Sequence, residues 1–276
     1  MLQTKGSVES IKQAQERTTL DDLDRNIMQW LDAPDPSGNY NAAGVKRQQE
    51  TGTWLLQDPS FIVWKSANNS FLWIHGKPGC GKSVLSFTII SHLVDSSHED
   101  ALVAYFYFDF QRQEQQTVEG FLRSLIRQIA SRGSGLHKSL RGVYESCSHG
   151  RTKPTTQNLV TVLHTLLQAS RTVDIVIDAA DECNERQNLL QLLEEMNKWN
   201  INGLHLLVTS RREKDIEDAF NPLLSGRISL EKSAIESDIR DFIHHKVHSD
   251  GSKLLKWPID IRLDIESTLL EGADGM

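Results

Sequence analysis

The chain is poor in cysteine and has no long apolar run. Its 276 residues include three cysteines, Cys80, Cys147 and Cys183. They cannot make a paired disulfide framework and have no C-x-x-C spacing, which favours a reducing, intracellular compartment. No stretch approaches the roughly 18 uninterrupted apolar residues of a membrane span. The first residues, Met1–Gly6, also lack the apolar run of a signal peptide, so the sequence predicts a cytoplasmic protein.

An excess of positive charge is also missing. Lys and Arg number 30 against 37 Asp and Glu, and the net charge is −7. A protein that binds nucleic acid by neutralising phosphates needs a basic surface, so no nucleic-acid partner is expected. The ten histidines include the pair His244 and His245 but no H-E-x-x-H spacing, so a zinc site is not expected either.

The middle of the chain alternates between short apolar runs and amphipathic segments. The runs predict strands at 71–75, 101–110, 173–177, 204–208 and 227–230. Apolar residues at helical spacing predict helices over 82–94, 118–129, 159–167 and 189–196. Residues 133–154 are less regular. Strands that alternate with helices form a mostly parallel sheet with right-handed crossovers, so the predicted fold class is α/β.

The N-terminal part is predicted to be a helical lead-in. Apolar residues recur at helical spacing over 20–31, and Pro34 marks the end of that helix. The turn-rich stretch 34–41 looks like a linker. A second short helix is expected over 50–57, ending near Pro59.

The C-terminal part is also expected to be helical. Ser233 and Glu236 have the spacing of a capping box ahead of an amphipathic segment. Residues 259–269 fit both strand alternation and helical spacing, and we favour a helix. The predicted domains are a helical lead-in and linker at 1–60, a nucleotide-binding core at 61–231, and the start of a helical accessory domain at 232–276.

A phosphate-binding loop is indicated between the first core strand and the first core helix. The segment fits G-x-x-x-x-G-K-[ST] with Gly76, Lys77, Pro78, Gly79, Cys80, Gly81, Lys82 and Ser83. Its glycines let successive backbone N–H groups point at an anion, and the following helix adds its positive end. Lys82 supplies a charge for the β- and γ-phosphates, and the Ser83 hydroxyl is placed to ligate Mg²⁺.

The alternative to this loop is a chance glycine-rich turn. The strand before it and the helix after it are the context that the functional interpretation requires. These residues, together with Val84, are therefore predicted to bind a magnesium–nucleoside triphosphate.

An acidic partner follows the third predicted strand. Asp178 ends that strand, where ligands of open α/β sheets bind, and a carboxylate there can hold Mg²⁺ through water. The alternative is a surface Asp that caps the next helix. Asp181 and Glu182 are candidates to orient or deprotonate an attacking water, or else charged residues of a solvated turn. Many fast P-loop ATPases place Glu directly after the strand-end Asp, so Ala179 suggests slow or conditional hydrolysis.

The end of the fourth predicted strand offers a sensor for the γ-phosphate. If this strand lies beside the one that leads into the phosphate loop, it brings Ser210 or Arg211 close to the γ-phosphate. The alternative is an ordinary polar strand end. We favour Arg211 as the sensor.

These features together resemble the NACHT domain of STAND-class NTPases. The chain is most similar to the fungal branch, which includes heterokaryon-incompatibility and ankyrin-repeat proteins. The resemblance covers about residues 18–276 and is carried by residues 51–56, 71–83, 105–110, 175–183 and 207–212. The D-A-x-D-E pattern that begins at Asp178, with a small residue after the first Asp, is fairly specific to this class.

The resemblance implies a P-loop NTPase sandwich with sheet order 5-1-4-3-2 and a small helical domain over the nucleotide. It implies Lys82 and Ser83 on the phosphates and Mg²⁺, Asp178 on Mg²⁺, and Arg211 as the sensor, with Asp181 or Glu182 near the water. Family members act as switches: closed diphosphate-bound monomers open, exchange nucleotide and oligomerise. In fungi the output is often non-self recognition and regulated cell death.

Such proteins usually also carry an N-terminal effector domain and C-terminal winged-helix and repeat regions. This chain is therefore expected to be a fragment or a truncated product.

Two other functional classes remain open from the sequence. One is a metabolic P-loop kinase or an AAA-type ATPase, and the other is a scaffold whose P-loop is vestigial. The choice between ATP and GTP is also open, because residues outside these motifs read the base. Thr51–Trp54, just upstream of the loop, are the candidates to approach it.

Overall fold

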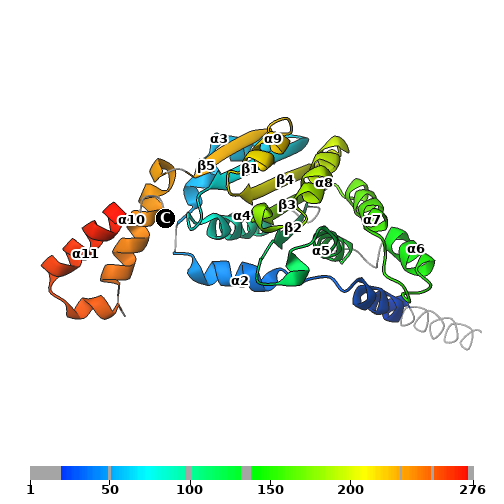
Figure 1. Cartoon of the computed structure of the whole chain (residues 1–276), viewed down its shortest axis with the longest axis horizontal. Helices are drawn as coiled ribbons and strands as arrows, with labels where there is room; N and C mark the ends of the chain where they lie inside the picture. The colour runs from blue at the N-terminus through cyan, green and yellow to red at the C-terminus, as the bar shows by residue number, and fades with distance from the viewer. Residues whose placement is uncertain are drawn as a thin grey trace, which may run out of the picture.

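The structure, a computed structural model, describes residues 20–48, 51–96, 101–131, 138–230, 232–249 and 252–272, except for the side chains of 232–235. A five-stranded sheet lies at its centre (Figure 1). Its strands are β1 (Asn69–Gly76), β2 (Ala101–Tyr107), β3 (Thr172–Asp178), β4 (Leu204–Ser210) and β5 (Gly226–Leu230).

All four strand pairings are parallel, and the order is β2-β3-β4-β1-β5. This confirms the predicted α/β class and the order 5-1-4-3-2. Strand β1 lies between β4 and β5, so the tip of β4 is beside the start of the phosphate loop, with His75 in register with Ser210.

Helices surround this sheet and continue beyond its last strand. In chain order they are α2 (Ser37–Lys46), α3 (Pro59–Ser66), α4 (Lys82–Ser96), α5 (Val118–Ala130), α6 (Lys138–Ser146), α7 (Thr156–Ala169), α8 (Arg186–Lys198), α9 (Lys214–Phe220), α10 (Lys232–His248) and α11 (Ile259–Gly272). Short 3-10 turns are η1 (Thr53–Gln57), η2 (Gln113–Gln115), η3 (Ala180–Glu182) and η4 (Lys253–Lys256). A further helix covers 20–31. None of the helices within the described ranges has the length and apolar character needed to cross a bilayer.

The strands bury both of their faces. Alternate residues of β1 belong to different apolar cores: Trp73 is part of the core that includes residues of α5, α7 and α8, while Leu72 and Ile74 are part of the core that includes residues of α3 and α4. This is why the strands are nearly continuous apolar runs rather than alternating ones. The result is the three-layer arrangement expected for a P-loop fold.

The predicted linker at 34–41 is wrong, because most of it lies in α2. The ring of Tyr40 packs against those of Phe87 and Tyr105, with centroids 4.6 Å and 5.2 Å away, and Ala43 is buried. These tertiary contacts stabilise a helix whose glycine and asparagine residues favour a turn locally.

The predicted short helix at 50–57 is also different in the structure. Residue 50 lies outside the described residues, and 53–57 form the 3-10 turn η1. Pro59 begins α3 instead of ending a helix, because Asp58 caps α3 by accepting a 2.7 Å hydrogen bond from the Ser60 N–H. Proline is well suited to a first helical position, where its missing N–H would have no partner. Two more helices, α6 and α9, were not predicted.

The C-terminal helices confirm the helical prediction for 259–269. Helices α10 and α11 pack side by side and lie at the end of the molecule beyond β5, away from α6 and α7 (Figure 1). The side chain of Ser233, half of the predicted capping box, lies outside the described side chains.

Candidate functional site

The loop between β1 and α4 has the backbone that its glycines allow. Gly79 and Gly81 have φ values of 79° and 89°, a region that residues with a Cβ rarely adopt. At Gly76 a Cβ would lie 2.6 Å from the Cys80 sulfur and 2.9 Å from the Leu230 Cβ. The loop therefore requires glycine for its curl and for its close packing on β5.

Lys82, the first residue of α4, folds back over this loop. Its ammonium donates to the carbonyl oxygens of Gly76 and Lys77, both at 2.9 Å. Phosphate oxygens are stronger acceptors for an ammonium than neutral carbonyls are. A polyphosphate seated on the loop can therefore draw this group from the carbonyls to itself.

Asp178 lies at the end of β3 and is almost fully buried. One carboxylate oxygen accepts from the Ser83 hydroxyl at 2.6 Å; the other accepts from Ser86 at 2.6 Å and Thr209 at 2.7 Å. Burial raises the pKa of Asp178, and the three hydroxyl donors oppose that shift only in part. A divalent cation placed here would offset the cost of the buried charge.

The donor set of Ser83 and Asp178 fits Mg²⁺. A hydroxyl and a carboxylate supply the hard oxygen ligands that this ion prefers, and it fills the rest of its octahedron with water and phosphate oxygens. The two side chains already touch, so both lie within reach of one hydrated ion. Ser86 and Thr209 were missed by the sequence analysis, although Ser86 follows Ser83 at one-turn spacing on α4.

The backbone turns sharply after Asp178. Ala179 has a φ of 54°, and its N–H donates to the Thr209 hydroxyl at 3.0 Å. The turn η3 then carries Asp181 and Glu182 towards the tips of β4 and β2. The two carboxylates consequently have different environments.

Asp181 is paired with Arg211. Its carboxylate accepts from the Arg211 backbone N–H at 2.9 Å and from the Arg211 Nε at 3.0 Å. The Asp181 side chain is 4% exposed, whereas that of Arg211 is 48% exposed. The carboxylate of Asp181 is thus engaged by Arg211, whose own side chain is about half exposed.

Glu182 is half-buried and, unlike Asp181, has no ion pair with Arg211. One of its oxygens accepts from the Phe110 N–H at 3.2 Å. Burial raises its pKa, and the nearby carboxylates of Asp181 and Asp109 add to that increase. A carboxylate with a raised pKa is a stronger base than usual once it is deprotonated.

Ser210, the second sensor candidate, faces another direction. Its hydroxyl accepts from the indole N–H of Trp73 at 2.9 Å and donates to the Arg211 carbonyl at 2.8 Å. The residue is fully buried. Of the two sensor candidates, only Arg211 therefore has a side chain that reaches the surface of the site.

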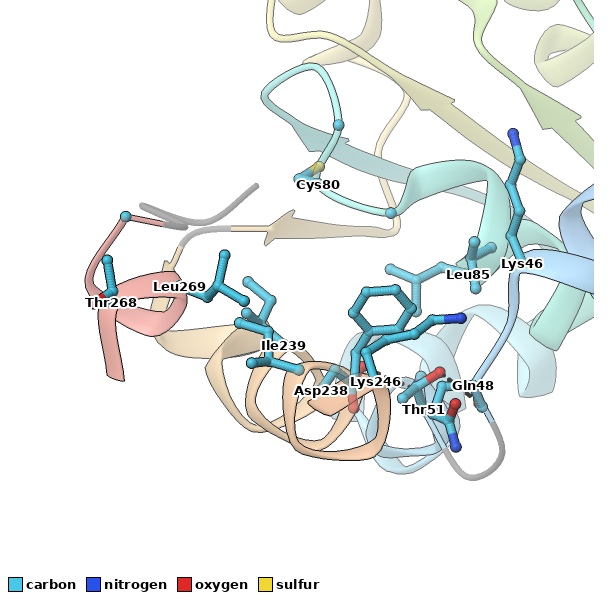
Figure 2. Close-up of a pocket in the computed structure, with 17 residues that line it drawn as sticks. Lys46, Gln48, Thr51, Cys80, Leu85, Asp238, Ile239, Lys246, Thr268 and Leu269 are labelled. Atoms are coloured by element: carbon cyan, nitrogen blue, oxygen red, sulfur yellow. Dashed lines mark hydrogen bonds between the residues drawn. The ribbon is translucent and has the colours of Figure 1, made fainter. Parts of the chain in front are cut away.

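A cavity of about 670 Å³ adjoins the phosphate loop and opens between it and the C-terminal helices. Its walls come from four parts of the chain: Lys46, Gln48, Thr51 and Gly52; Gly79, Cys80, Gly81, Val84 and Leu85; Asp238, Ile239, Phe242, Ile243 and Lys246; and Thr268, Leu269 and Gly272. In Figure 2, Ile239 and Leu269 approach the cavity from α10 and α11, and Leu85 approaches it from α4. The space is mostly apolar and continues from the loop that carries Cys80.

One carboxylate joins the upstream segment to α10. Asp238 accepts from the Gly52 N–H and from the Trp54 indole N–H, both at 2.9 Å. Thr51 and Gly52 line the cavity, so part of the segment 51–54, which was expected to approach the base, lies at the cavity wall. Asp238 was not predicted from the sequence, because nothing local in α10 indicates that it meets residues almost 190 positions earlier.

Comparisons with known proteins agree with the geometry. The sequence model of the family described as "Nephrocystin 3, N-terminal" matches residues 50–211. The vegetative incompatibility protein HET-E-1 of Podospora anserina is 29% identical over 206 residues, which are 70% of this chain and 15% of that protein. The chain therefore spans a small part of that relative. These matches confirm the resemblance that the motifs predicted.

Solved structures are more distant. A structure of Drosophila ORC bound to DNA matches 85% of this chain and 55% of its own, at 14% identity and a TM-score of 0.46. A structure of C. elegans PCH-2 matches 82% of this chain and 58% of its own, at 15% identity and a TM-score of 0.39. Both TM-scores are below 0.5, so the sheet order, not these likenesses, establishes the fold.

Proposed function

The chain belongs to the nephrocystin 3, N-terminal family and is a NACHT-type nucleotide-binding domain, and from this we propose that it is a switch operated by a magnesium–nucleoside triphosphate. The contact between Ser83 and Asp178, beside the ammonium of Lys82, carries the proposal. A hydroxyl and a strand-end carboxylate suited to Mg²⁺ are in contact there, and the Lys82 ammonium is near enough to act electrostatically on the same carboxylate.

In the proposed complex the backbone N–H groups of the loop and the Lys82 ammonium bind the β- and γ-phosphates. Ser83 and Asp178 hold Mg²⁺, which neutralises phosphate charge when it is bound. Ser86 and Thr209 fix the Asp178 carboxylate, so that it needs little rearrangement to meet the ion. The nucleotide is ATP or GTP.

We further propose that hydrolysis is slow or conditional. Asp181 is engaged by Arg211, and Ala179 stands where many fast P-loop ATPases have Glu. Glu182 is then the group left to accept a proton from water. Arg211 acts as the sensor: a γ-phosphate competes with Asp181 for its guanidinium, and the pair separates only when a triphosphate is bound.

The cavity would couple nucleotide binding to the position of α10 and α11. Its apolar volume accommodates the base and ribose of a nucleotide whose phosphates lie on the loop. Because α10 and α11 form one side of that space, nucleotide binding would change how these helices are held, with Asp238 as their tie to Gly52 and Trp54. A cytoplasmic receptor for non-self recognition, in which exchange of diphosphate for triphosphate leads to self-association, is the role we propose for the longer protein.

The test is to identify the nucleotide that copurifies with the chain and to titrate Mg-ATP, Mg-GTP and Mg-ADP by calorimetry. We expect one bound nucleotide per chain, with turnover well below one event per second. Several turnovers per second without a partner would favour the kinase or AAA-type ATPase instead. An absence of heat with every nucleotide would support a vestigial P-loop and overturn the proposal.

A further inference from the structure

Three side chains with metal-ligating atoms meet where α10 packs on α11. His244 and His248 lie one turn apart on α10, with ring centroids 4.7 Å apart. Glu266 of α11 reaches both: its oxygens lie 3.1 Å from Nδ1 of His244 and 2.9 Å from Nε2 of His248. The three potential ligand atoms all lie within 4.8 Å of one another.

We propose that His244, His248 and Glu266 form a binding site for a zinc-like divalent cation that clips α10 to α11. Two imidazoles and one carboxylate suit a borderline transition ion such as Zn²⁺, whereas Mg²⁺ prefers oxygen ligands alone. No zinc site was expected from the sequence because the H-E-x-x-H motif is absent. His244 and His248 have the four-residue spacing of that motif's histidines, but His245 stands where the motif has Glu, and the third candidate ligand comes from another helix.

The geometry needs only a small adjustment. Bonds of about 2.0–2.1 Å in a tetrahedron place ligand atoms about 3.4 Å apart, and both Glu266 contacts are already shorter than that. The two contacts use different oxygens of Glu266, and one ligand atom from each residue lies within 4.8 Å of the others, so the separations that are still longer than about 3.4 Å must close. The His244 side chain is 65% exposed, so it can rotate towards His248 without disturbing the core. Water would complete the coordination.

Arg262 lowers the affinity of this site for a cation. Its guanidinium lies 3.1 Å from Nδ1 of His248, and a guanidinium can only donate. Nδ1 therefore accepts, and Nε2 carries the proton directed at Glu266. A cation on Nε2 requires that proton to move to Nδ1, where it would face the Arg262 donor, so Arg262 must turn away when the cation binds.

The clip lies next to the nucleotide cavity but does not depend on it. Helix α10 contributes Ile239, Phe242 and Lys246 to the cavity wall, and α11 contributes Thr268 and Leu269. Fixing α10 to α11 would stiffen two walls at once. The cation test itself involves no nucleotide, so its failure is separate from any failure of the proposed switch.

The test is a titration of the full chain, stripped with a chelator, with Zn²⁺ by calorimetry and with Co²⁺ by absorption spectroscopy. We expect one equivalent bound, a rise in the thermal midpoint, and a Co²⁺ spectrum without a thiolate charge-transfer band. His248→Gln and Glu266→Gln should each weaken binding at least about tenfold. His245→Gln, on the same helix but outside the cluster, is the matched control and should bind like wild type.

Arg262→Gln gives the sharpest outcome, because removal of the opposing donor should tighten Zn²⁺ binding. Weaker binding by this variant would overturn ligation through Nε2 of His248. If the His244→Gln and His248→Gln variants bind Zn²⁺ with wild-type affinity, the cation lies elsewhere. A thiolate charge-transfer band would also place it elsewhere, since Cys80, Cys147 and Cys183 are free thiols. Thermal midpoints that are unchanged in the presence of chelator establish that the variants fold. If a variant fails to fold, the Co²⁺ spectrum of the wild type still shows whether the ligands are imidazole and carboxylate or thiolate.

Discussion

Replacing Lys82 by alanine should separate nucleotide binding from folding. In the free protein Lys82 makes two hydrogen bonds to loop carbonyls, and it is only partly buried. Water can replace those bonds, so the cost in the free energy of unfolding should be about 1 kcal/mol. For a chain of this size that lowers the thermal midpoint by about 2–4 °C.

The effect on the bound state should be much larger. At a nucleotide concentration 100 times its Kd, the wild type gains about 2.7 kcal/mol, which raises the midpoint by roughly 5–10 °C. Two hydrogen bonds from Lys82 to phosphate, at about 1.5 kcal/mol or more each, amount to a loss of affinity of at least roughly a hundredfold. At the same nucleotide concentration the variant then gains only about 0.3–0.4 kcal/mol, or roughly 1 °C.

The assay is a thermal shift with and without Mg-ATP or Mg-GTP, supported by calorimetry. Lys198→Ala is the matched control, because Lys198 lies on α8 and pairs with Glu194 one turn away on the surface. It should keep the full ligand-induced rise. If Lys82→Ala also keeps that rise, the assignment of the phosphate site is wrong.

Three further variants test the other groups of the site. Asp178→Asn should abolish the Mg²⁺ dependence of nucleotide affinity. The same variant tests the pH dependence of stability. Because the folded-state pKa of Asp178 is raised above 3.8, the free energy of unfolding of the wild type falls as pH rises from 3.8 through the raised value, and urea unfolding should show a smaller fall in the variant. Glu182→Gln should lower single-turnover hydrolysis at least about tenfold and remove an acidic limb of the pH–rate profile centred above 4.5, since the base acts only when deprotonated. A wild-type profile in that variant would assign the proton transfer to another group. Arg211→Gln should bring the Kd values for triphosphate and diphosphate to within a few-fold of each other in calorimetry, whereas an unchanged ratio would remove Arg211 as the sensor.

The sheet and the phosphate loop could be predicted because their signals are local. Each strand is a short apolar run ended by polar residues, and the loop needs glycines at fixed positions for its positive φ angles. The strand order, in contrast, came from the resemblance to NACHT domains. The spacing of strands along the chain does not say which of them become neighbours.

The failures share one physical cause, which is contact between distant segments. Helix α2 forms because Tyr40 packs on Phe87 and Tyr105, and the cavity wall exists because Asp238 meets Gly52 and Trp54. The His244, His248 and Glu266 cluster is of the same kind, since its third member comes from another helix. Propensity and motif spacing contain no information about such pairs.

The tip of β4 connects the parts of the proposed switch. Thr209 donates to Asp178, Ser210 is held by Trp73 of the strand that leads into the phosphate loop, and Arg211 pairs with Asp181. Arg211 directly follows the last residue of β4, so a shift of its backbone towards a γ-phosphate would also pull on the Thr209 hydroxyl that holds the proposed metal-binding carboxylate. On this proposal the strand end that senses a triphosphate would also adjust the magnesium site, and a diphosphate, which lacks the γ-phosphate, would leave both unchanged.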